Sequence, residues 1–123
     1  MKGCILAAAI LLLVLGGVIV NALFIRHTAN QLFEWVEALP DVPNTQETPL
    51  TIVDIRQKLE KKVPLLGITV AYTTIDRVSE ALISLESFAQ TGDIRQYHAT
   101  LSLLIDLIEE LARTEKITIE NIL

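Results

Sequence analysis

The stretch IDRVSEALISLESFAQTGDIRQYHATLSLLIDLIEEL, residues 75–111, decides the fold. Apolar residues recur at steps of three and four positions before Gly92, and a second series with the same spacing follows it. The two series are Ile75, Val78, Leu82, Leu85 and Ala89, and then Ile94, Tyr97, Leu101, Leu104, Ile108 and Leu111. This spacing places each series on one face of an α-helix. Gly92 predicts the end of one helix, and Asp93 with Gln96 predicts the start of the next, so the two should form an antiparallel hairpin.

A further helix is predicted before this hairpin. Thr48 has the residue type of an N-cap, and Pro49 suits the first helical position because it has no backbone N–H to leave unpaired. An apolar stripe then runs from Ile52 to Val70. Pro64 and Gly67 interrupt it, so we expect a kink or a break there.

The boundary between this helix and the hairpin has two interpretations. The apolar stripe could continue through Ile68 and Ala71, which would make one bent rod of the two helices. Thr73 with Asp76 has the form of a capping box and favours a separate helix that starts near Thr74. We prefer a turn at residues 72–74.

The N-terminal segment differs from the rest of the chain. Gly3 to Ile25 is a run of 23 residues without a charge, 19 of them hydrophobic. As a helix it would be about 35 Å long, enough to cross the roughly 30 Å hydrocarbon layer of a bilayer. We therefore predict a membrane span from Gly3 to Ile25, followed without a break by a short helix that ends at Pro40.

A cleaved signal peptide is the alternative for this segment. Lys2 and the apolar run fit such a peptide, and Val20-Asn21-Ala22 has the small residues of a cleavage site. The run continues to Ile25, which favours a retained anchor. Orientation depends on Lys2 against Arg26 and His27, nearly a tie. We expect a single-pass protein of the cell membrane with its soluble domain outside the cytoplasm; the alternative is a secreted binding domain cleaved near Ala22.

Composition excludes several classes of protein. The chain has 123 residues, a net charge of −5 and a single cysteine, Cys4. One cysteine allows no internal disulfide and no four-thiolate zinc site, and an acidic chain is a poor nucleic-acid binder. His27 and His98 have no metal-ligand spacing, and no nucleophile motif or phosphate-binding glycine loop occurs. We expect no enzymatic activity, no catalytic or metal residues, no cofactor and no small-molecule substrate.

The remaining candidates are surfaces for partners. Trp35 is nine residues past Arg26, about 13 Å by helical rise and therefore beyond the lipid headgroups. Core packing is the simpler role for Trp35, and contact with a partner is the other. The C-terminal residues Ile117, Ile119 and Ile122 are β-branched and suggest an extended tail that covers the bundle or docks on a partner. A homo-oligomer and a multi-pass membrane protein are both reasonable partners besides the membrane itself.

We therefore predict an all-α protein, with an N-terminal transmembrane helix, a small antiparallel bundle of three to four helices and a short extended C-terminal tail. The anchor occupies residues 1–28 and the soluble domain residues 29–123. The predicted helices span about 29–39, 49–72, 74–90 and 93–113, and the tail spans 116–123.

This order of features is similar to that of a known family. The run Ile75-Asp76-Arg77 with Glu80-Ala81-Leu82, the Gly92-Asp93 turn and the ending Ile119-Glu120-Asn121-Ile122-Leu123 carry the similarity. The chain resembles the small bacterial membrane-anchored proteins grouped as domain of unknown function 4363. The resemblance implies an all-helical fold and a spore-forming Gram-positive type of host, and brings no known catalytic activity or functional residues. Members often have an acidic-His turn where this chain has Thr73-Thr74.

Overall fold

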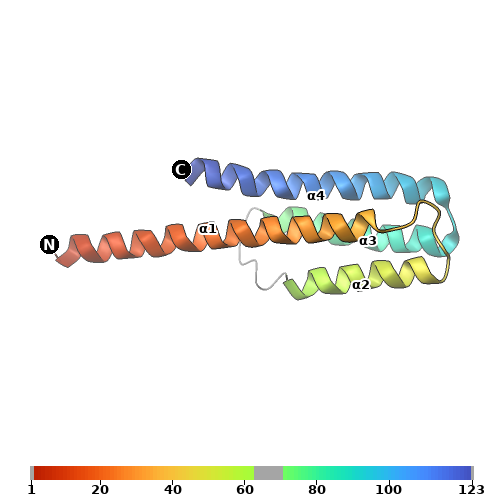
Figure 1. Ribbon diagram of the computed structural model, residues 1–123, viewed down its shortest axis with the longest axis horizontal. Helices are drawn as coiled ribbons and strands as arrows, with labels where there is room; N and C mark the ends of the chain where they lie inside the picture. Colours follow the sequence, from red (N-terminus) through yellow and green to blue (C-terminus); the bar gives the residue numbers. More distant parts are fainter. Residues whose placement is uncertain (1, 63–70, 123) are drawn as a thin grey trace.

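The computed structural model describes residues 2–62 and 71–122, without the side chains of 71–72 and 114–122. All regular structure in these ranges is helical: α1 (Lys2–Glu37), α2 (Glu47–Lys62), α3 (Ala71–Thr91) and α4 (Ile94–Ile122). Successive helices run antiparallel along one long axis (Figure 1). Helix α4 packs against both α3 and α1, and α2 packs against α3, whereas the contact between α1 and α2 is much smaller. The predicted all-α bundle is confirmed.

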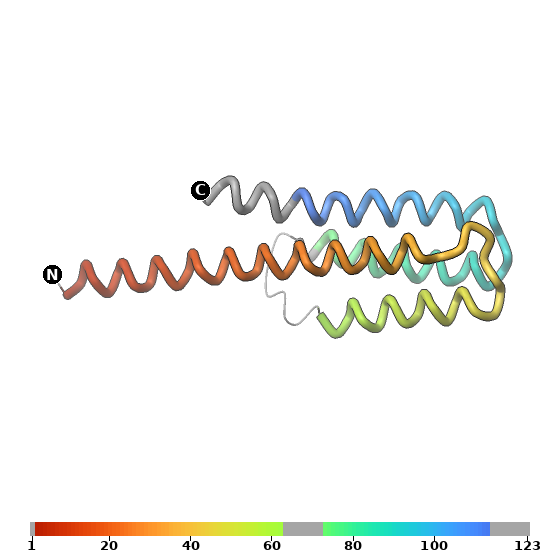
Figure 2. Tube along the Cα trace, in the orientation of Figure 1, coloured from red at the N-terminus to blue at the C-terminus, as the bar shows by residue number. Residues whose placement is uncertain are grey.

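Helix α1 is one continuous helix with two environments. Its residues Ala22, Ile25, Ala29, Leu32 and Val36 recur at steps of three and four and are buried in the bundle. Towards the N-terminus the same helix projects alone, well past the other three (Figure 2). Nine large apolar side chains between residues 5 and 20 are 37% to 75% exposed there. The prediction that the apolar segment continues into the bundle without a break is confirmed.

The start of α2 differs from the expectation. Asn44, not Thr48, caps the helix: its Oδ1 atom accepts the backbone N–H groups of Gln46 at 2.9 Å and Glu47 at 3.0 Å. The Thr48 hydroxyl accepts the N–H of Asn44 at 2.9 Å, which makes the cap reciprocal. The N–H of Thr48 bonds to the carbonyl of Asn44 at 3.1 Å, and Pro49, the next residue, has no N–H to continue this series of helical bonds.

Helices α2 and α3 are separate and run in opposite directions, so the single bent rod is wrong (Figure 1). Helix α3 begins at Ala71, so the preferred turn at residues 72–74 and the start near Thr74 are wrong as well: residues 72–74 are helical. The predicted kink at Pro64 and Gly67 lies outside the described residues.

The α3–α4 hairpin forms as predicted. Gly92 has a φ of 70°, the left-handed region that glycine adopts without a steric penalty. The N–H of Gly92 bonds to the carbonyl of Ala89 at 3.3 Å, and the N–H of Asp93 bonds to that of Phe88 at 3.1 Å. This pair of bonds is a Schellman motif. The carboxylate of Asp93 then accepts the N–H of Gln96 at 3.2 Å and caps α4.

The core lies along the bundle axis and is built from the stripes of all four helices. Tyr97 is the largest side chain in it and is 0% exposed. The other members that are fully enclosed include Leu32, Ile52, Leu59, Val78, Leu82, Leu85, Leu104 and Leu111. The predicted apolar faces therefore point inward, except at Ile94, which is 44% exposed at the start of α4.

The prediction of an extended C-terminal tail at residues 116–123 is wrong, because α4 continues as a helix to Ile122. After Asp93 the chain contains no glycine or proline that would stop it. The β-branched residues disfavour a helix by only a few tenths of a kcal/mol each, roughly, and a helix already formed propagates at little cost.

We expect Gly92→Ala to lower the free energy of unfolding by about 1–2 kcal/mol, because alanine is strained at a positive φ. Thermal unfolding of the purified protein, followed by circular dichroism, measures this. Gly17→Ala is the matched control, since nothing lies within 4 Å of a side chain added there and alanine favours helix. Equal melting temperatures for the two variants would contradict the assignment.

Candidate functional site

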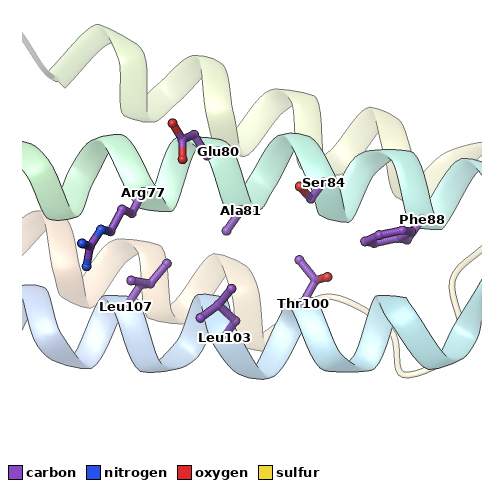
Figure 3. A pocket seen from close by; sticks show the side chains of 8 residues that line it. All are labelled: Arg77, Glu80, Ala81, Ser84, Phe88, Thr100, Leu103 and Leu107. Carbon is purple, nitrogen blue, oxygen red and sulfur yellow. The ribbon is translucent and has the colours of Figure 1, made fainter.

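An open groove lies between α3 and α4 on the outside of the bundle (Figure 3). It has a volume of about 380 Å³. The small side chains of Ala81, Ser84 and Thr100 leave the hollow, because larger residues at these positions would fill it. The lining residues are Arg77, Glu80, Ala81, Ser84 and Phe88 of α3, and Thr100, Leu103 and Leu107 of α4.

The chemistry of this groove suits apolar contact. Phe88, Leu103 and Leu107 are the large apolar side chains among its lining residues, and Leu103 is 52% exposed. Arg77 and Glu80 lie towards one end (Figure 3). Among the described residues that line the groove there is no histidine or cysteine, and so no pair of nucleophile and imidazole base. Such a surface can accept apolar side chains of another molecule.

Trp35 packs against the core and also lies close to two lysine ammonium groups. Its ring is partly buried against the core. The Nζ atoms of Lys58 and Lys62, both on α2, lie 5.1 Å and 5.6 Å from its centroid. Such cation–π contacts are worth about 0.5–1 kcal/mol each at exposed sites. Burial lowers the pKa of the Lys62 ammonium from its ordinary value.

The loop between α1 and α2 is fastened to the start of α4. The Tyr97 hydroxyl donates to the carbonyl of Pro40 at 2.8 Å. The Nε2 atom of His98 bonds to the carbonyl oxygen of Asp41. Burial raises the pKa of Tyr97, and the Asp41 carboxylate acts in the same direction. These two contacts fix the end of the bundle that is remote from the N-terminus.

The predicted site residues do not converge on one place. Gly3 lies on the projecting part of α1, whereas Ile25 is buried in the bundle. Trp35 lies between α1 and α2. The backbone of Ile117, Ile119 and Ile122 is helical, and their side chains lie outside the described residues. Partner contact by Trp35 and by these isoleucines stays a prediction.

The sequence did not predict the groove. The apolar series of the fourth helix includes Leu104, which faces the core, whereas the adjacent Leu103 lies beside this series and is 52% exposed. Strict spacing from Tyr97 through Leu101 to Leu104 could have placed Leu103 outside. Among the residues that the structure describes, no group of three His, Cys, Asp or Glu side chains could hold a metal ion.

The fold defines a class: an antiparallel helical bundle whose first helix extends as an apolar rod beyond it. A family model described as "Domain of unknown function (DUF4363)" matches residues 25–122. The chain therefore belongs to this family, and the resemblance noted in the sequence is confirmed. The match begins at Ile25, within the buried stripe of α1 that starts at Ala22. No curated protein and no solved structure matches the chain.

The adjacent leucines of α4 provide a test of the groove. We expect Leu103→Ala to change the free energy of unfolding by less than about 1 kcal/mol, and Leu104→Ala to lower it by about 2–5 kcal/mol, since Leu104 is 0% exposed. Urea unfolding of the two variants measures the difference. A comparable loss for both would show that Leu103 is part of the core rather than of an open surface.

Tyr97 predicts a pH dependence of stability. Its pKa is raised in the folded state, so its contribution is complete below about pH 10 and is lost as the pH rises through the folded pKa. Melting temperatures measured from pH 8.5 upwards should fall in the alkaline range. Tyr97→Phe should cost about 1 kcal/mol at neutral pH and reduce the alkaline decline. An unchanged decline in this variant would assign it to other groups.

Proposed function

We propose that this protein is a single-pass membrane protein whose helical bundle serves a non-enzymatic structural or protein-interaction role at the cell envelope. The observation that carries the proposal is the division of α1. It is long and apolar enough to cross a membrane, and none of its most apolar 18-residue window is buried. Exposed apolar side chains on all sides of a helix are unfavourable in water and favourable in lipid.

The structure supports a boundary for the span. Ala22 and Ile25 are 1% and 4% exposed, so the bundle already covers α1 at these positions. The part available to lipid therefore runs from Gly3 to about Asn21, which is about 28 Å long as a helix. This length still matches the hydrocarbon layer. Arg26 and His27 then follow about one turn beyond, at the depth of the headgroups.

The secreted alternative is less well supported. Cleavage after Ala22 would cut a peptide bond inside a continuous helix, next to a side chain that the bundle buries. That helix would have to unwind locally before a protease could act. The groove is consistent with the non-enzymatic part of the proposal, since Arg77 and Glu80 are the ionisable side chains among the described residues that line it.

We expect the native protein to stay in membranes after alkaline carbonate extraction and to retain residues 1–22 by intact mass. Leu11→Arg with Val14→Arg should release it, because each arginine costs about 2.5–3.5 kcal/mol at the centre of a span. Gln57→Arg with Ser102→Arg adds the same charges to exposed positions of the bundle and should leave it in the membrane. A mature chain that begins near Leu23 would instead establish the secreted domain.

The orientation is tested separately. If the bundle lies outside the cytoplasm, protease added to intact protoplasts should digest it. Protection in intact protoplasts, with digestion after lysis, would place it inside.

A further inference from the structure

The contact between α1 and α2 holds a site that packing alone does not explain. We propose that Trp35, Lys58 and Lys62, called here the Trp–Lys site, bind a carboxylate-bearing segment of a partner protein. This inference deepens the proposed interaction role and rests on it.

Charge is the first argument. Both ammonium groups lie within 6 Å of the centroid of one indole ring. They are therefore within about 11 Å of each other and repel, as like charges at i and i+4 on a helix do. Lys58 forms an ion pair with Asp54 at 2.9 Å. Apart from this pair, neither Lys58 nor Lys62 forms an ion pair with the residues that the structure describes. An anion between the two ammonium groups would remove the repulsion.

Burial is the second argument. Lys62 is partly withdrawn from water, and a charged group in that position gains more from a nearby anion than an exposed one does. The indole supplies apolar surface beside the two charges. A carboxylate on a short apolar stem, as in glutamate, matches this combination of groups.

Access is the third argument. The small contact between α1 and α2 leaves this the least closed side among the neighbouring helix pairs.

Height above the membrane separates a protein from a lipid as the source of the anion. Trp35 is nine residues past Arg26, or about 13 Å along α1. The headgroup layer is only about 5–8 Å thick on each side of the hydrocarbon. Phosphates of the same bilayer therefore lie below the Trp–Lys site, and an extramembrane segment of a partner lies level with it.

The test uses the full chain in zwitterionic nanodiscs and a labelled amphipathic helical peptide whose polar face carries glutamates. Trp35 is the single tryptophan, so its fluorescence reports on the site directly. We expect the peptide to change Trp35 emission and to bind in a salt-dependent manner. Lys58→Gln with Lys62→Gln should weaken the affinity about tenfold, measured by peptide anisotropy.

The matched control removes two charges elsewhere. Lys61→Gln with Arg95→Gln changes exposed positions and should weaken the affinity less than about twofold. Three results would overturn the proposal. The two pairs of substitutions could weaken the peptide affinity equally, the acidic peptide could fail to bind, or a peptide with lysines in place of the glutamates could bind equally well. A change in Trp35 emission that requires anionic lipid would also overturn it, because lipid headgroups would then be the ligand. A change that depends only on protein concentration would do the same, because it would indicate a second copy of the chain. The carbonate extraction does not depend on peptide binding, so it tests the membrane anchor independently of the Trp–Lys site.

Discussion

Burial of one stripe of α1, from Ala22 to Val36, is the constraint on which the rest of the molecule depends. This stripe packs against the bundle, where α4 is its main neighbour, and α4 in turn holds α3 through the hairpin at Gly92. Without it, the remaining helices would expose the apolar faces that α1 covers. Because this stripe belongs to the same helix as the projecting apolar segment, one continuous helix joins the core of the bundle to the proposed anchor.

Much of the fold could be predicted because its determinants are local. Steps of three and four identify each helical face, and the Gly92-Asp93 pair marks a helix end and a helix start within a few residues. The errors came where two local preferences competed. Asn44 displaced Thr48 as the cap of α2, and the β-branched residues after Lys116 followed the existing helix instead of ending it.

The candidate site was less predictable because it depends on pairs of helices. The groove exists where the small residues Ser84 and Thr100 lie opposite each other on α3 and α4 (Figure 3). Which residues of two helices come to lie opposite each other cannot be read from the sequence of either helix alone. The sequence marked Trp35 as a residue with two roles. Its position against Lys58 and Lys62 follows only from the antiparallel placement of α1 and α2.

The continuity of α1 has a mechanical consequence. Between Val18 and Glu37 the helix contains neither glycine nor proline, so it has no hinge where it passes from its projecting part into the core. A tilt or a rotation of the projecting part is thus transmitted to the bundle as a rigid-body movement. If the projecting part spans a bilayer as proposed, a change in bilayer thickness that tilts it would reorient the groove and the Trp–Lys site together.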